Sequence, residues 1–317
     1  MAAKRVPPTT TTAEVDGRRL RLSNLDKVLY PEAGFTKAEV IDYYVRVAPA
    51  LLPHVADRGV TLRRYPDGVE GGSFFEKRCP SHRPAWIGTF DGPGDRNGTI
   101  GYCALDSVAA LAWSANMAAL EIHAPMARGT DIEAPTMCVF DLDPGPGTGI
   151  AECAGLALRI GDVLDRFGGL RCWAKTSGSK GLQLYLPLNS PHTHEHCASF
   201  AQAVAQVLER DDPAHVTSTM RKDVRPGRVF VDWSQNSRHK TTIGPYSLRA
   251  RPRPTVSTPV TWDEVDAAAS GGDLVFEAAD VLARVEADGD LFAPTLTVVQ
   301  HLPGARDAVT GGGAKSR

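Results

Sequence analysis

Two aspartates one residue apart carry the clearest chemical signal in the sequence. Asp141 and Asp143 follow the apolar run Met137–Phe140. Residues i and i+2 of a strand lie on the same face, so both carboxylates would project together. Carboxylate oxygens suit Mg²⁺ or Mn²⁺, and two such ions catalyse in-line phosphoryl transfer. The following Pro144 and Gly145 are equally typical of an ordinary strand-to-turn transition, so the pair alone favours neither interpretation.

A third carboxylate stands in the middle of a later apolar strand. Asp232 lies between Val231 and Trp233, a position for which aspartate has poor β-propensity. Such a residue needs a buried partner or a cation to offset its cost. Three carboxylates, two close together and one distant in sequence, are what a two-metal polymerase or nuclease requires.

A loop rich in hydrogen-bond donors could hold a phosphate. Residues Thr176–Gly181 include Ser177 and Lys180, and with the backbone N–H groups these are the donors that a triphosphate needs. The Walker spacing is absent, and a plain hairpin turn is the competing interpretation. His123 could also contact phosphate, although a histidine packed in the core would look the same in the sequence.

The formal net charge of −2 conceals two oppositely charged segments. Residues 219–254 hold nine Lys and Arg against two Asp, whereas residues 262–290 hold nine Asp and Glu against one Arg. Aromatic residues interleave the basic segment, and this combination suits a nucleic acid, which offers phosphates and stacking bases. A solvated charged face would have the same composition.

Length and composition indicate a globular protein. The 317 residues are 42% hydrophobic and contain no apolar run near the ~20 residues of a membrane span. The N-terminus has no secretion signal, so we expect a cytoplasmic, nucleoid-associated protein without a membrane partner. Cys79 with His82, and the alternating His192, His194 and His196, could each suggest zinc, but no second ligand pair stands at zinc-finger spacing, which disfavours a zinc site. Without a CxxC pair, the cysteines are predicted to be free thiols. They are Cys79, Cys103, Cys138, Cys153, Cys172 and Cys197.

The order of predicted elements indicates a mixed α+β fold. A capping box at Thr36–Glu39 opens a helix that Pro49 should bring to its end, and residues 107–120 form a second, buried helix. The later elements follow the order of a split βαβ, RRM-like module. In such a sheet the first and last strands are neighbours, which would bring Asp232 beside Asp141 and Asp143. These elements are strand 137–140, helix 149–167, strands 170–175 and 182–186, helix 199–209 and strand 229–233.

Five motifs occur in order along nearly the whole chain: Leu22–Pro31, Phe74–Lys77, Phe140–Gly145, Thr176–Leu182, and Val231–Asn236 with Lys240–Arg249. Together they resemble the polymerase domain of bacterial ligase D, in the archaeo-eukaryotic primase superfamily, and its stand-alone actinobacterial Prim-Pol relatives. The resemblance implies a primase fold, in which an N-terminal αβ module packs on an RRM-like catalytic module around mixed sheets. One catalytic domain would span 16–300, between a disordered 1–15 and a flexible 301–317. Its predicted parts are 16–130, 131–260 and a helical 261–300.

The resemblance also implies an activity. It indicates a ribonucleotide-preferring, DNA-dependent polymerase that uses two divalent ions, Mn²⁺ or Mg²⁺, and NTP or dNTP to fill short gaps or extend 3′ ends at breaks. Its partners would be primed or gapped DNA with a downstream 5′-phosphate, a DNA ligase and a Ku-like end-binding protein. The implied catalytic metal ligands are Asp141, Asp143 and Asp232. The implied nucleotide contacts are His123, Ser177, Lys180, Arg249, Gln235 and Arg63, and the implied DNA contacts are Asn24, Lys27, Lys37, Phe74, Phe75 and Arg225.

The sequence departs from the family at Gln183, where the family has a histidine. Glutamine keeps the capacity to hydrogen-bond but loses a titratable group. A non-catalytic DNA-end-binding module that recruits a ligase is the alternative function, and a metal nuclease would use the same carboxylates. The complete set of three aspartates counts against the first alternative, and the triphosphate-like loop around Lys180 counts against the second.

Overall fold

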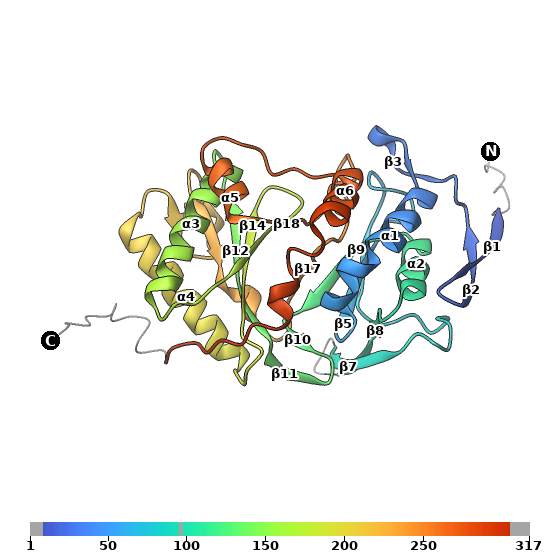
Figure 1. Cartoon of the computed structure of the whole chain (residues 1–317), viewed down its shortest axis with the longest axis horizontal. Coiled ribbons are helices and arrows are strands. Elements are labelled where there is room, and N and C mark those ends of the chain that lie inside the picture. The colour runs from blue at the N-terminus through green and yellow to red at the C-terminus, as the bar shows by residue number, and fades with distance from the viewer. Residues whose placement is uncertain (1–8, 95–97, 305–317) are drawn as a thin grey trace.

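The chain contains both helices and strands, and most of the strands form two six-stranded sheets, which confirms the expected α+β class (Figure 1). The computed structural model describes residues 9–94 and 98–304. Helices α1 and α2 accompany the first sheet, and α3, α4 and α5 accompany the second. The helices are α1 Lys37–Val55, α2 Val108–Asn116, α3 Ile150–Arg166, α4 His194–Asp211, α5 Trp262–Ala269 and α6 Ala278–Asp288.

The first sheet has the strand order β17-β9-β5-β8-β7, with β6 paired to the end of β5. Strand β17 comes from far along the chain, and its Ile243 lies opposite His123 of β9. The stretch 131–260 therefore contributes one strand to the N-terminal sheet. The strands are β5 Gly59–Arg64, β6 Phe74–Glu76, β7 Thr89–Pro93, β8 Thr99–Ala104, β9 Ala119–Pro125 and β17 Thr241–Ile243.

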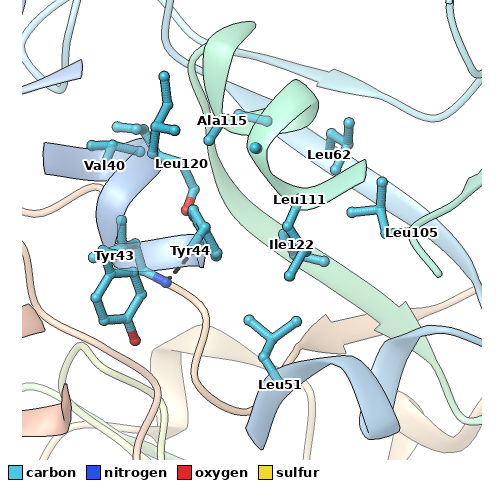
Figure 2. Packing of buried hydrophobic residues seen from close by; sticks show 14 of the residues in the cluster. Val40, Tyr43, Tyr44, Leu51, Leu62, Leu105, Leu111, Ala115, Leu120 and Ile122 are labelled. Carbon is cyan, nitrogen blue, oxygen red and sulfur yellow. Dashed lines mark hydrogen bonds between the residues drawn. The ribbon is translucent and has the colours of Figure 1, made fainter. Parts of the chain in front are cut away.

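An apolar core fills the space between this sheet, α1 and α2 (Figure 2). Leu51 of α1 and Leu111 of α2 belong to it, and Tyr44 of α1 is buried with them. The Tyr44 hydroxyl donates to the carbonyl of Leu120 (2.7 Å) and accepts from the backbone N–H of Leu248 (3.1 Å). Both hydrogen bonds satisfy the buried phenol, and they tie α1 to β9 and to the segment after β17.

The second sheet has the strand order β15-β16-β12-β14-β13-β18. Its four central strands, with α3 and α4, have the predicted split βαβ arrangement, and β12 runs antiparallel to both β14 and β16. Asp141 lies opposite Asp232, so the predicted adjacency is confirmed. Phe140 and Leu142 pack on the face covered by helices, which leaves the opposite face to Asp141. The strands are β12 Met137–Pro144, β13 Trp173–Thr176, β14 Leu182–Pro187, β15 Val216–Thr217, β16 Val229–Asp232 and β18 Pro259–Val260.

Small elements and the C-terminal helices complete the described chain. Helix α5 packs on α3 and helix α6 packs on α1, so the acidic segment 262–290 spans both sheets. Three short sheets are β1 Thr10–Val15 with β2 Arg18–Ser23, β3 Val28–Tyr30 with β4 Phe35–Thr36, and β10 Ala127–Arg128 with β11 Asp131–Pro135. The 3-10 helices are η1 Pro31–Ala33, η3 Lys222–Val224, η4 Trp233–Asn236 and η5 Ala293–Leu296.

Two helix ends differ from the prediction. The capping box at the start of α1 is present, but the helix continues through Pro49 and Pro53 to Val55. Both prolines are exposed, so their missing N–H groups face solvent while the apolar side of the helix keeps its packing. Helix α2 ends at Asn116, because the chain turns there and Leu120 already belongs to β9.

Cys79 and Cys103 form a disulfide with an S–S distance of 1.97 Å, so the prediction of six free thiols is wrong for this pair. The two residues meet because the Cys79 N–H donates to the carbonyl of Gly101 in β8 (2.8 Å). This contact depends on tertiary packing, which the cysteine spacing does not reveal. The other four cysteines are free, as predicted, and buried: Cys138, Cys153, Cys172 and Cys197.

The two ends of the described chain are more structured than predicted. Residues 10–15 form β1, so the predicted disorder of 1–15 is wrong for this strand, while residues 1–8 lie outside the described part. Leu302 is buried beyond the predicted end of the domain, and residues 305–317 of the predicted tail lie outside the description. Within the described residues no helix is both long and apolar enough to span a membrane.

Candidate active site

A row of four polar side chains crosses the second sheet. Asp232 on β16 lies opposite Asp141 on β12. Asp141 in turn lies opposite Gln183 on β14, which lies opposite Lys175 on β13. Directly opposed residues share a face of the sheet, and Asp143 shares it with Asp141 because the two are two positions apart. The three predicted metal ligands therefore lie on one face, away from α3 and α4.

The carboxylates of this row are electrostatically suited to a cation. Burial raises the pKa of Asp141 to about 7, and the charges of Asp143 and Asp232 add to the rise. Burial and Asp232 also raise the pKa of Asp143. A divalent ion would relieve both effects, and oxygen donors fit Mn²⁺ or Mg²⁺. Within the described residues, however, no three His, Cys, Asp or Glu side chains are already arranged to hold a metal ion.

A tight turn fixes the carboxylate of Asp232. Its Oδ1 accepts from the backbone N–H (3.0 Å) and the hydroxyl (2.5 Å) of Ser234, and its Oδ2 accepts from Gln235 Nε2 (3.0 Å). Asn236, the last residue of η4, bonds to both the N–H and the carbonyl of Val139 at 2.8 Å. This amide extends the β12–β16 pairing past Asp232 and holds the turn in place. Gln235, a predicted nucleotide contact, is thus bonded to Asp232 here.

Lys175 is a site residue that the sequence analysis missed. Its side chain is fully buried, and Nζ donates to Gln183 Oε1 (2.5 Å) and Ser257 Oγ (2.7 Å). Burial lowers the pKa of Lys175 well below its usual range, and the charge of Asp141 partly opposes this effect. Gln183 lies directly opposite Asp141 on the neighbouring strand, so it stands between the lysine and the carboxylates. A lysine at the end of a mostly apolar predicted strand was the available signal in the sequence.

The Thr176–Gly181 loop folds back on itself between β13 and β14. The hydroxyl of Ser177 accepts from two backbone N–H groups of the loop (3.3 and 3.1 Å), and Lys180 is exposed. Gly178 has a φ of +66°, and a Cβ there would lie 2.6 Å from Cγ of Arg249. A glycine is therefore needed for the loop to pack on this arginine. The structure thus brings two parts of the predicted nucleotide site together.

Three of the predicted nucleotide contacts meet at a buried carboxylate. Glu121 on β9 lies 2.9 Å from His123 Nε2, 3.2 Å from Arg249 Nε and 3.6 Å from Arg63 Nη1. Burial alone would raise the pKa of Glu121, but the hydrogen bond from His123 and the charge of Arg249 lower it to about 2. The sequence analysis missed this residue. Its position two residues before His123, on the same face of a strand, was the only signal.

Both aromatic residues of β6 are exposed. The relative exposure is 46% for Phe74 and 55% for Phe75, so neither belongs to the core. Arg64 lies over the ring of Phe74 at 5.3 Å, and Arg63 lies over the ring of Phe75 at 5.1 Å. Phe75 also meets the ring of His123 edge-on at 5.5 Å. Exposed aromatic faces backed by cations can stack on nucleic-acid bases.

Arg225 belongs to a loop that lies against β12, the strand that carries Asp141 and Asp143. Its guanidinium packs over Phe230 at 3.8 Å and donates to the carbonyl of Met220 (2.9 Å). The loop approaches so closely that a Cβ on Gly145 would lie 2.0 Å from the carbonyl oxygen of Arg225. Burial raises the pKa of Asp143, and the charge of Arg225 partly opposes the rise. The loop therefore brings positive charge to the edge of the carboxylate row.

The three residues predicted to grip a 5′-phosphate lie together at the start of α1. The N–H of Lys37 donates to the carbonyl of Lys27 (2.8 Å), and the N–H of Lys27 donates to that of Asn24 (3.1 Å). Burial lowers the pKa of Lys37 to about 8, with contributions from the charges of Lys27 and Arg64. Lys27 also forms an ion pair with Asp67 (2.9 Å). These cations stand at a helix N-terminus, which itself attracts anions.

A family model described as "LigD, primase-polymerase domain" matches residues 36–292. The chain belongs to this family. The matched region includes the carboxylates of the second sheet, the buried Glu121 with its three side-chain partners, and the aromatic pair of β6. The resemblance seen in the sequence is thereby confirmed at the level of the family.

Individual LigD proteins show the same relationship. The multifunctional non-homologous end joining DNA repair protein LigD of Mycobacterium tuberculosis is 46% identical over 282 residues, which cover 86% of this chain and 36% of the relative. LigD of Pseudomonas aeruginosa is 34% identical over 250 residues, which cover 78% of this chain and 29% of the relative. The solved polymerase domain from Mycobacterium tuberculosis Ligase D in complex with DNA matches with a TM-score of 0.83 and 45% identity, over 88% of this chain and 98% of that one. The chain thus spans about a third of the length of these curated relatives.

Proposed function

We propose that this chain is a DNA-dependent nucleotidyltransferase that prefers ribonucleotides and fills short gaps or extends 3′ ends at DNA breaks. The observation that carries the proposal is the pairing of Asp232 with Asp141 on the sheet face that Asp143 shares. Membership of the LigD primase-polymerase family and the named role of the relatives in end joining support the same function. The preferences for ribonucleotides and for Mn²⁺ rest on the resemblance to the ligase D polymerases.

In the proposed reaction the primer 3′-hydroxyl attacks the α-phosphate of a nucleoside triphosphate, and pyrophosphate leaves. Asp141, Asp143 and Asp232 would hold two divalent ions, which supply charge stabilisation and a lower pKa for the attacking hydroxyl. The remaining contribution of the protein is positioning and preorganised charge. Arg249, with the 176–181 loop packed against it, would bind the triphosphate oxygens.

The proposed DNA path runs over the aromatic pair of β6 and past the basic loop. Phe74 and Phe75 would stack on template bases, and Arg225 would lie near the primer end beside the carboxylates. Asn24, Lys27 and Lys37 would hold the downstream 5′-phosphate. A DNA ligase would then seal the remaining nick, and a Ku-like protein could bring the ends together.

Primer extension on a gapped duplex with a phosphorylated downstream strand tests the proposal. We expect incorporation to be greater with NTP than with dNTP and greater with Mn²⁺ than with Mg²⁺. Salt-sensitive DNA binding without incorporation would indicate a non-catalytic end-binding module. Shortening of the primer, in place of extension, would indicate a nuclease.

Removing the two buried or half-buried lysines is expected to erase the preference for a phosphorylated downstream strand. Each charge-assisted contact contributes about 1.5–3 kcal/mol, so the Lys27→Ala, Lys37→Ala double variant should bind the phosphorylated gap about tenfold or more weakly. Binding of the same gap without the phosphate should change little. Titration of fluorescent gapped DNA, with and without the phosphate, measures both quantities.

Two controls make this prediction specific. Arg46→Ala removes an exposed cation from the outer face of the same helix, where it pairs with Asp42 at 3.7 Å, and should leave the preference intact. Because the pKa of Lys37 is about 8, its ammonium is charged below that pH and is lost as the pH rises through it. The wild-type preference should therefore be stronger at pH 7 than at pH 9. A double variant with wild-type preference would rule out this phosphate pocket.

A further inference from the structure

Glu121 is a buried carboxylate in the middle of the proposed nucleotide site. Its side chain is 1% exposed. A buried charge costs stability unless it is paired and hydrogen-bonded. Here the partners are the side chains of His123, Arg249 and Arg63, and the backbone N–H of Ala250, which donates to Oε1 at 3.1 Å. The cost of burial is thus offset by four contacts, three of them with proposed ligands of the nucleotide.

The partners of Glu121 come from distant parts of the chain. Arg63 lies directly opposite Glu121 in the β5–β9 pairing. His123 shares the strand and the face of Glu121, two residues further along. Arg249 belongs to the segment after β17, and its stem packs on Gly178 of the phosphate-loop candidate. A single carboxylate therefore sets the relative positions of three cationic or titratable side chains.

The cluster retains an excess of positive charge. In this cluster of Glu121, His123, Arg63 and Arg249, two guanidinium groups face one carboxylate. The relative side-chain exposure is 33% for Arg63 and 18% for Arg249. The neighbouring Arg64 and Glu76 behave differently, because one guanidinium nitrogen lies 3.2 Å from both oxygens of one carboxylate and the charges balance. A purely structural ion pair balances in this way. Surplus, partly exposed guanidinium charge is suited to an anionic ligand.

We propose that Glu121 is a positioning residue that holds Arg63, His123 and Arg249 in the orientation in which they grip the triphosphate of the incoming nucleotide. The choice of ligand rests on the proposed polymerase function. Glu121 does not contact the nucleotide itself, since two anions repel each other. Arg63 also packs against the ring of Phe75, so Glu121 fixes the cation that contacts one of the proposed template-stacking rings.

Charge and position make opposite predictions for the variant Glu121→Gln. By charge alone, loss of an anion near the triphosphate would tighten nucleotide binding. If Glu121 acts by positioning, the loss of its ionic contacts frees both arginines and weakens binding. The direction of the change therefore decides between the two, and a general loss of stability is monitored separately by the melting temperature.

The experiment measures nucleotide binding and catalysis on the whole chain. The probe is a fluorescent ATP analogue with a non-cleavable α–β bridge, titrated in Mn²⁺, and the KM for ATP is determined by primer extension. We expect both the Kd and the KM to rise about tenfold or more in Glu121→Gln, because charge-assisted contacts are lost, while kcat stays within about threefold. Glu121→Asp keeps the charge and should show a smaller rise in the same direction, even if the glutamine variant fails to fold.

Glu76→Gln is the matched control, since it removes a carboxylate of the same sheet that pairs, within the described residues, with Arg64. Its nucleotide affinity should equal that of the wild type. Unchanged or tighter binding by Glu121→Gln, unchanged binding by Glu121→Asp, or equal weakening by Glu76→Gln would each overturn the inference. Failure of the proposed function appears differently: the wild-type chain would then bind the analogue without extending a primer.

Discussion

Replacing Asp232 with alanine is expected to lower the rate of primer extension by about 10³-fold or more. Charge stabilisation by bound metal ions contributes several kcal/mol to such a reaction, and about 1.4 kcal/mol corresponds to a factor of ten. Asp232 lies opposite Asp141, so the substitution removes one of the three proposed metal ligands. The measurement is single-turnover extension on gapped DNA at saturating nucleotide and Mn²⁺.

Binding of gapped DNA should survive the loss of Asp232. The substitution removes an anion from a site that also contains Lys240, whose Nζ lies 3.7 Å from the Asp232 carboxylate. Less negative charge beside a polyanion does not weaken their association. Asp223→Ala is the matched control, because it removes an exposed carboxylate of the same basic segment that pairs with Arg221. Wild-type extension by the Asp232 variant would exclude the proposed two-metal mechanism.

The carboxylate row could be predicted because its geometry follows from local rules. Strand alternation places Asp141 and Asp143 on one face. The split βαβ order of elements makes the first and last strands neighbours, and it therefore brings Asp232 to the same place. Aspartate is disfavoured inside an apolar strand, so the presence of Asp232 there was itself a sign of a buried partner or a cation.

The residues that support the site could not be predicted, because their partners are set by register between distant segments. Glu121 pairs with Arg63 on the neighbouring strand β5 and with Arg249. Arg249 lies near Glu121 only because β17, which precedes it, joins the first sheet. Lys175 is informative only once Gln183 is known to lie opposite it. Alternation gives the face of a residue, but it does not give the identity of its cross-strand neighbour.

A second large effect is expected from Arg58, which the sequence did not single out. This residue lies between α1 and β5 and is 6% exposed. Its guanidinium donates to the carbonyls of His54 (3.1 Å), Pro125 (3.0 Å) and Met126 (2.7 Å) and to the hydroxyl of Thr136 (2.8 Å). All four partners are neutral, and burial, together with the charge of Arg128, lowers the pKa of Arg58 to about 10.

These four contacts connect the end of a strand in the first sheet with the start of a strand in the second. Pro125 ends β9 in the first sheet, whereas Thr136 immediately precedes β12, the strand that carries Asp141. Arg58→Met keeps most of the apolar stem but removes the guanidinium donor from the carbonyls of His54 and Pro125, whereas the carbonyl of Met126 still accepts from the N–H of Thr136 (3.0 Å). Each acceptor that loses its donor costs about 1–3 kcal/mol, so we expect the free energy of unfolding to fall by about 3–5 kcal/mol. Urea unfolding followed by circular dichroism measures this change.

The matched control is Arg128→Met, which removes a half-exposed arginine whose guanidinium lies 3.5 Å from Asp57. Exposed pairs of this kind contribute about 0–1 kcal/mol, so the control should unfold near the wild-type midpoint. A folded domain is stable by about 5–15 kcal/mol, so the expected loss removes a large part of the stability. Because Thr136 leads directly into β12, the surviving folded fraction should also extend primers more slowly. If the free energy of unfolding falls by less than about 1 kcal/mol, water must replace the guanidinium at these carbonyls, and Arg58 does not join the two sheets.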